Sequence, residues 1–130
     1  MNELTCLELS IVLWFVHVTI QGVVGMTGVG PRYLFGSRDV DVEPQGLLFP
    51  RATRALRNYV ENLGPFVAAD LGLIATQHTG GIGAMIWVIA RIIYIPLYLS
   101  GVSNFRTLCW MASLVGLVLM LLRLAGGTGL

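Results

Sequence analysis

Charged residues are scarce in this chain of 130 residues, of which only 12% are Asp, Glu, Lys or Arg, whereas a soluble domain carries about 25%. Lysine is absent, because all 8 basic residues are arginines, and the net charge is only +1. Without a broad basic surface, nucleic acid is not an expected partner. Hydrophobic residues make up 55% of the chain, and this composition predicts an integral membrane protein.

Cysteine and histidine are equally scarce. Cys6 and Cys109 lie far apart in apolar stretches, without the spacing of a zinc site, and we expect both to be buried thiols. His17 and His78 are the only imidazoles and fall in different parts of the chain. We expect His17 to be a packed, hydrogen-bonded core residue rather than a ligand, and we predict no metal site.

Long hydrophobic runs, in contrast, are plentiful. A bilayer core of about 30 Å needs roughly 20 apolar residues per helix, and four segments approach this length, at about 4–25, 52–76, 82–99 and 105–124. The first segment begins with Glu3 and Glu8 instead of basic residues, which indicates a retained span rather than a signal peptide. The predicted fold is a single all-α domain, an integral membrane four-helix bundle.

The first connection, about 26–50, is the only long one, and its Gly, Pro and acidic residues favour an extended loop. Most arginines lie in this connection or just beyond it, at positions 32, 38, 51, 54 and 57, and the second connection has none. Because positive charge is enriched in cytoplasmic loops, both chain ends should face away from the cytoplasm. The short chain suggests the inner membrane of a bacterium.

The second segment carries one polar stripe. At 100° per residue, one helix face collects Arg54, Arg57, Asn58, Glu61 and Pro65. A central arginine costs about 2.5 to 3.5 kcal/mol to insert into a membrane, so the stripe should face protein, water or a polar ligand. Pro65 is expected to kink this helix. Asp70 points away from Glu61 and is expected near the outer end of the span, paired or exposed to water.

Two further polar faces occur in the later segments. Trp87, Arg91, Tyr94 and Tyr98 share one face of the third segment, and the fourth opens with Arg106, Thr107 and Trp110. If the three faces converge, they enclose a site for a largely anionic molecule beside an apolar one. Individual residues also have structural explanations, since Arg57 and Glu61 could form an ordinary ion pair, and Arg51 and Arg54 could reach lipid headgroups. Arginines on three separate segments favour the shared site.

Three stretches of sequence together resemble the MAPEG family, the membrane-associated proteins in eicosanoid and glutathione metabolism. They are R-x-x-R-A-x-R-N-x-x-E-x-x-x-P-F from Arg51 to Phe66, A-R-I-I-Y-I-P-L-Y from Ala90 to Tyr98, and F-R-T-L-C-W from Phe105 to Trp110. The resemblance covers essentially the whole chain, and its most specific part is the first stretch. It implies a homotrimer of four-helix bundles that binds glutathione between subunits near the cytoplasmic face.

The resemblance also implies roles for individual residues. Arg57, Asn58 and Glu61 match family residues that hold the charged and polar ends of glutathione, and Tyr98 matches a tyrosine that contacts it. Arg106 matches the arginine that stabilises the thiolate, Trp110 stands where an aromatic residue packs on the ligand, and Arg91 matches another family arginine. In some members a histidine replaces Tyr94 and a serine replaces Thr107. A family arginine near the end of the first span has Arg32 as its nearest candidate here.

The function expected from these residues is that of a glutathione-dependent transferase or peroxidase acting on hydrophobic electrophiles or lipid hydroperoxides, with a role in detoxification or lipid metabolism. A free thiol has a pKa of about 8.5, and a nearby arginine stabilises the thiolate nucleophile. Arg106 would supply that charge, while the candidate glutathione-binding set is Arg54, Arg57, Asn58, Glu61, Arg91, Tyr94, Tyr98, Thr107 and Trp110. Two alternatives stay open: a non-catalytic trimer that binds lipid or a partner, and a small proton-coupled exporter using Glu8.

Overall fold

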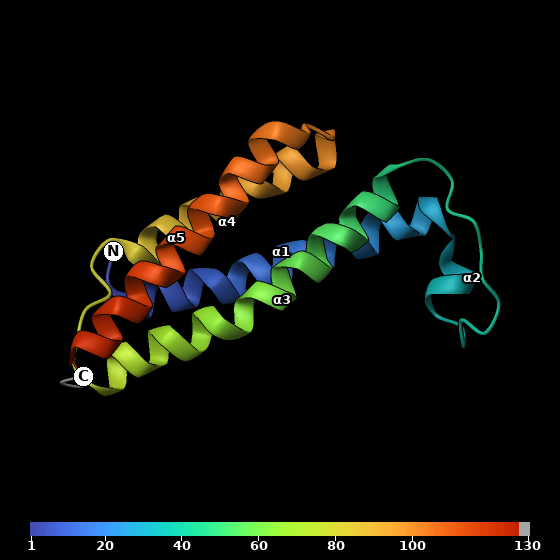
Figure 1. Ribbon diagram of the computed structural model, residues 1–130. Helices are drawn as coiled ribbons and strands as arrows, with labels where there is room; N and C mark the ends of the chain where they lie inside the picture. The colour runs from blue at the N-terminus through green and yellow to red at the C-terminus, as the bar shows by residue number, and fades with distance from the viewer. Residues whose placement is uncertain (128–130) are drawn as a thin grey trace.

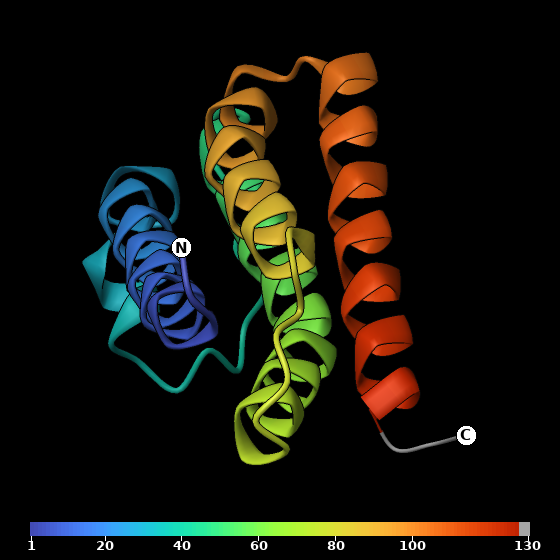
Figure 2. The same cartoon turned by 90° about the vertical axis from the view of Figure 1, so that its left-hand side faces the viewer.

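Within residues 1–127, which the computed structural model describes, every regular element is a helix and no strand occurs. The helices are α1 (Glu3–Gly28), α2 (Pro31–Leu34), α3 (Leu48–Ala75), α4 (Gly83–Ser100) and α5 (Ser103–Gly127). The four long helices run side by side, and the short α2 lies at one end of the bundle (Figures 1 and 2). The predicted all-α class is confirmed.

Three of the long helices, α1, α4 and α5, are long and apolar enough to cross a membrane. Helix α3 has 28 residues, which is ample length for a bilayer. Its first half carries Arg51, Arg54, Arg57 and Glu61, and it does not reach the apolarity of the other three helices. The crossing of the membrane by α3 therefore stays a prediction.

The bundle is built from two helix pairs, α1 with α3 and α4 with α5 (Figure 1). Helices α4 and α5 approach closely because both contact points are glycines. A Cβ atom at Gly116 would lie 2.7 Å from the Gly83 carbonyl oxygen, and one at Gly83 would lie 2.7 Å from the Gly116 carbonyl oxygen. Any larger residue at either position would force the two backbones apart.

Aromatic side chains fill the centre of the bundle and join its helices. The rings of Phe66 in α3 and Trp87 in α4 stack with their centroids 3.9 Å apart. Tyr59 in α3 is fully buried and donates a hydrogen bond of 2.6 Å to the Ser10 carbonyl oxygen in α1. This bond satisfies the phenol in an apolar environment and fixes α1 against α3.

The connection between the first two long helices is shorter and more ordered than the predicted extended loop of residues 26–50. Helix α1 continues to Gly28, α3 already begins at Leu48, and α2 occupies part of the segment between them. Pro31 starts α2, a position where its fixed φ angle favours a helix and its missing N–H is harmless. Farther along, α3 continues through Pro65 as one helix.

The core confirms some of the sequence predictions and contradicts others. His17 is buried, its Nδ1 lies 2.8 Å from the Leu13 carbonyl oxygen, and its ring stacks on Tyr59 at 4.4 Å, as expected for a core histidine. Cys6 is buried as predicted, but Cys109 is partly exposed, so the prediction of a buried thiol is wrong for Cys109.

Asp70 was expected to be paired or exposed to water, and both expectations are wrong. Its side chain has 0% exposure, and neither carboxyl oxygen has a hydrogen-bond partner among residues 1–127. Helical periodicity predicted the direction of this side chain, but it could not predict that α1 covers that face of α3.

Candidate functional site

A polar cavity of about 250 Å³ lies where α3, α4 and α5 meet. All of the residues that line it belong to the set predicted from the sequence: Asn58, Tyr94, Tyr98, Arg106, Thr107 and Trp110. One comes from α3, two from α4 and three from the start of α5. The predicted convergence of three polar faces is therefore real for these six residues.

Arg106 supplies the positive charge of this cavity. It lies in the first turns of α5, and its guanidinium carbon is 4.7 Å from the centroid of the Tyr98 ring. The Tyr94 and Tyr98 rings are adjacent, with centroids 5.3 Å apart. No carboxylate within residues 1–127 forms an ion pair with Arg106, so its guanidinium is available to an anionic ligand.

The remaining polar groups of the cavity are already oriented by neighbours. The Thr107 hydroxyl donates to the Ser103 carbonyl oxygen at 3.0 Å, which leaves its oxygen lone pairs for a ligand. The Asn58 carbonyl oxygen Oδ1 accepts a hydrogen bond of 2.8 Å from Nη1 of Arg91. The cavity thus combines a guanidinium, an amide, hydroxyl groups and an indole, a set suited to a ligand with carboxylate or thiolate groups.

Arg91 does not line the cavity but lies behind it in the core. Its side chain is 0% exposed, and its guanidinium carbon is 5.5 Å from the Trp87 ring centroid and 5.4 Å from that of Tyr94. Arg91 was predicted as a binding residue because helical spacing puts it on the face of Tyr94. Asn58 both lines the cavity and accepts a hydrogen bond from Arg91, so Arg91 reaches the cavity only through its neighbours.

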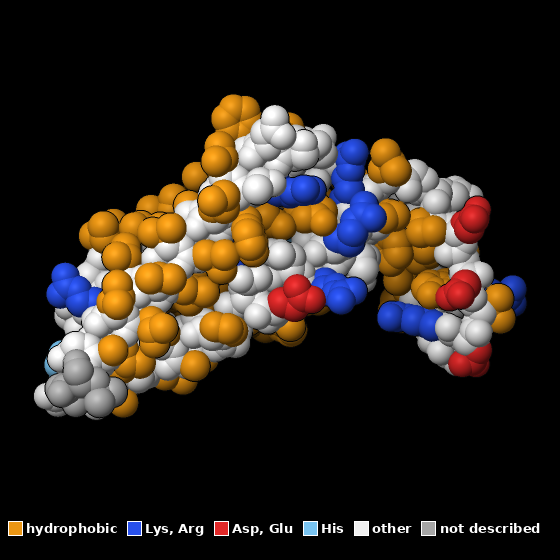
Figure 3. All heavy atoms as spheres, in the orientation of Figure 1, with side chains coloured by type: hydrophobic (Ala, Val, Ile, Leu, Met, Phe, Trp, Pro, Cys, Tyr) orange, Lys and Arg blue, Asp and Glu red, His pale blue; other side chains and the backbone are white. Residues whose placement is uncertain are grey.

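The other charged residues of the predicted stripe point outward from α3. Nε of Arg57 is 3.0 Å from Oε1 of Glu61, and the two side chains are 81% and 56% exposed. Arg54 is exposed as well, and none of these three lines the cavity. Figure 3 shows arginine side chains gathered toward the end of the bundle nearer α2, whereas hydrophobic side chains cover most of the opposite end.

Arg51 has a structural contact that the sequence analysis missed. Its Nη1 donates a hydrogen bond of 3.1 Å to the Leu99 carbonyl oxygen at the end of α4. Gly101 follows in the left-handed conformation, with φ of 81°, which glycine adopts easily at a helix end. Positive charge at a helix C-terminus is stabilising, so Arg51 helps to hold the turn between Tyr98 and Arg106. Gly101, which follows the third predicted segment, was the feature of the sequence that could have predicted a turn here.

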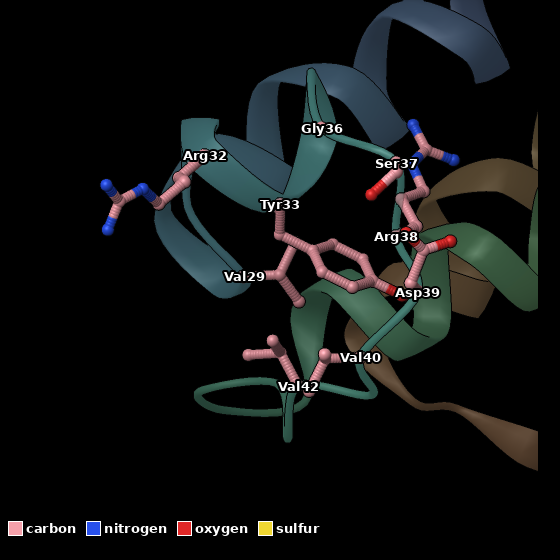
Figure 4. Close-up of a pocket in the computed structure, with 9 residues that line it drawn as sticks. All are labelled: Val29, Arg32, Tyr33, Gly36, Ser37, Arg38, Asp39, Val40 and Val42. Atoms are coloured by element: carbon pink, nitrogen blue, oxygen red, sulfur yellow. The ribbon is translucent and has the colours of Figure 1, made fainter.

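A second, larger cavity of about 540 Å³ lies in the connection around α2 (Figure 4). The Tyr33 ring extends across it toward Asp39, close to Val29, whereas Arg32 points away from Tyr33. Arg32, the candidate for the family arginine near the end of the first span, therefore lines a different cavity from Arg106. Because the two cavities share no lining residue, Arg32 lies apart from Arg106 and Asn58 in the single chain.

Comparison with known families gives one match. The sequence model of the MAPEG family matches residues 4–126, which include every residue of the polar cavity and all four long helices except the first residue of α1 and the last of α5. A search of curated proteins and a search of solved structures found no match.

Proposed function

The chain belongs to the MAPEG family, and from this premise we propose that it is a membrane-bound glutathione-dependent transferase or peroxidase acting on hydrophobic electrophiles. The observation that carries the proposal is the polar cavity, which brings Arg106 together with Asn58, Tyr94 and Tyr98. These residues come from all three motifs that resemble the family signature. Three apolar helices support an integral membrane location next to hydrophobic substrates.

The proposed chemistry rests on the free guanidinium of Arg106. A glutathione thiol is only partly ionised at neutral pH, and a desolvated cation beside it stabilises the thiolate, which is the nucleophile. Arginine stays protonated in proteins and cannot take the proton itself, so the proton would leave to water or a buffer base. The thiolate would then attack the electrophile, either displacing a leaving group that departs with the bonding electron pair or adding to a double bond whose carbanion takes a proton from water. With a hydroperoxide, attack would break the O–O bond and release an alcohol, and a second glutathione would reduce the resulting sulfenic acid to the disulfide and water. The cavity would contribute by holding the reactants in place.

We propose that assembly into a homotrimer completes this site. Arg54, Arg57 and Glu61 are exposed on α3 of the single chain. If α3 crosses the membrane as its fourth span, lipid is the one neighbour these charges cannot face. A second copy would cover them and bring them toward bound glutathione. The orientation proposed from the arginines puts this end of the bundle at the cytoplasmic side of a bacterial inner membrane.

The test is a titration of the protein in detergent with glutathione, recorded at the thiolate absorbance near 240 nm. The wild type should give a saturable thiolate signal, and Arg106→Ala should lose most of it, since about 1.4 kcal/mol of lost stabilisation corresponds to one pKa unit of the bound thiol. Arg123→Ala is the matched control, because Arg123 is an exposed arginine of the same helix that lies outside the cavity.

Two results would overturn the proposal. If the folded wild type binds no glutathione, the chain is a lipid-binding or partner-binding member without this chemistry. If Arg106→Ala and Arg123→Ala lower the thiolate signal equally, the cavity is not where the thiol binds.

A further inference from the structure

Arg91 is the one arginine among the described residues with a fully buried side chain. A buried guanidinium is costly unless it is paired, yet no carboxylate in residues 1–127 forms an ion pair with Arg91. Its hydrogen-bonding partner is the neutral Asn58, through Nη1, while Nε and Nη2 have none. The Trp87 and Tyr94 rings lie within cation–π distance and offset part of the cost.

The bond between Arg91 and Asn58 determines which end of the Asn58 amide faces the cavity. A side-chain amide has a carbonyl oxygen that accepts and an NH₂ group that donates, whereas a guanidinium only donates and is always protonated. Asn58 must therefore turn Oδ1 to Arg91, at 2.8 Å. A flipped amide would place NH₂ against the guanidinium and leave both groups unsatisfied.

The consequence for the cavity is that Asn58 offers it hydrogen-bond donors. No hydrogen bond within residues 1–127 occupies its NH₂ group, and Asn58 lines the cavity. A neutral partner such as glutamine or serine could exchange donor for acceptor and let the amide turn. Arginine cannot do this at any physiological pH.

We propose that Arg91 is a positioning residue that locks the Asn58 amide with its NH₂ toward the ligand, so that this wall of the site accepts only a hydrogen-bond acceptor. This rests on the proposed function, in which the acceptor is a carboxylate or peptide carbonyl of glutathione. Arg91 therefore determines specificity without touching the ligand. Burial of the Arg91 guanidinium is unfavourable, and its effect is to hold the Asn58 amide in one orientation.

The first experiment is a double-mutant cycle with glutathione affinity as the readout. Arg91→Met and Asn58→Ala should each weaken binding about tenfold, the size of one hydrogen bond to a charged group. The double variant should bind no worse than Asn58→Ala alone, because Arg91 acts through Asn58. Arg91→Lys keeps a charged donor and should recover most of the affinity. Additive losses of about a hundredfold would overturn the proposal, since they would mean direct contact or general misfolding.

Asn62→Ala is the matched control. The Asn62 side chain donates to the main-chain oxygen of Asn58 at 2.8 Å and leaves the Asn58 amide untouched. Its removal should change glutathione affinity less than twofold. A loss equal to that of Arg91→Met would mean that any disturbance of this helix is sufficient, and would overturn the specific role of Arg91.

A second experiment separates this inference from the proposed function, because it needs no ligand. The chain has only four asparagines, at positions 2, 58, 62 and 104, so selective ¹⁵N labelling gives a simple side-chain spectrum. The Asn58 NH₂ order parameter should be high in wild type and Asn62→Ala, and should fall in Arg91→Met. If it does not fall, the inference is wrong whether or not glutathione binds. If it falls while wild type binds no glutathione, only the proposed function fails.

Discussion

Asp70 is a carboxylate placed where water cannot reach it. Both of its oxygens lack a hydrogen-bond partner among the described residues, and its electrostatic neighbours on α1 are the carboxylate of Glu3 and the neutral thiol of Cys6. Burial of an ionised carboxylate without a partner is strongly unfavourable, so a charge on Asp70 works against folding of the bundle.

Replacing this group with a neutral one should therefore help folding at neutral pH. We expect Asp70→Asn to raise the unfolding temperature in detergent by about 3 °C, because the amide has the same shape and carries no charge that must be buried. Asp41→Asn, at an exposed position, should leave the temperature unchanged. Circular dichroism melting curves would check this. A lower unfolding temperature for Asp70→Asn would mean that the carboxylate has a stabilising partner.

The contact between α4 and α5 leaves no room for a side chain at Gly83 or Gly116. Gly116→Ala places a Cβ 2.7 Å from the Gly83 carbonyl oxygen and 3.0 Å from the Trp87 nitrogen, so it should destabilise the protein by about 1 to 3 kcal/mol. Gly22→Ala is the matched change, because nothing lies within 4 Å of a Cβ there. It should stabilise α1 by up to about 1 kcal/mol through helix propensity.

The measurement for this pair is the midpoint of unfolding in a graded detergent or denaturant series. The two glycine changes should move the midpoint in opposite directions. A higher midpoint for both variants would show that propensity, and not the close approach of the two backbones, controls both sites.

At the scale of helices, the sequence predicted the main elements well. Apolar runs and their breaks located all four long helices to within a few residues, because the length a bilayer requires is a strong constraint. Periodicity grouped Arg54, Arg57, Asn58 and Glu61 on one stripe, but the structure sends only Asn58 into the cavity. Periodicity shows which side of a single helix is polar. It does not show how much of that side the neighbouring helices cover. The same limit explains why Arg91 could not be placed behind Asn58 in advance.

At the scale of the whole molecule, one prediction concerns the membrane topology. If α3 crosses the membrane, Ser37 before it and Thr79 after it lie on opposite sides. Single cysteines at these two positions, with Cys6 and Cys109 replaced by alanine, should react with an impermeant maleimide from opposite faces of sealed vesicles. In the proposed orientation, Ser37→Cys is the cytoplasmic one. Labelling of both from the same face would restrict the membrane crossings to α1, α4 and α5.

The burial of Arg91 has a consequence for how the chain is made. Helix α4 leaves the ribosome with an arginine near its middle, and α3 precedes it with its own charges. Each alone would enter lipid at a cost, of about 2.5 to 3.5 kcal/mol for a central arginine. Nη1 of Arg91 on α4 donates a hydrogen bond of 2.8 Å to Oδ1 of Asn58 on α3. If α3 crosses the membrane, the two helices therefore enter the bilayer most readily as a pair, and biogenesis should delay release of α3 until α4 has been synthesised.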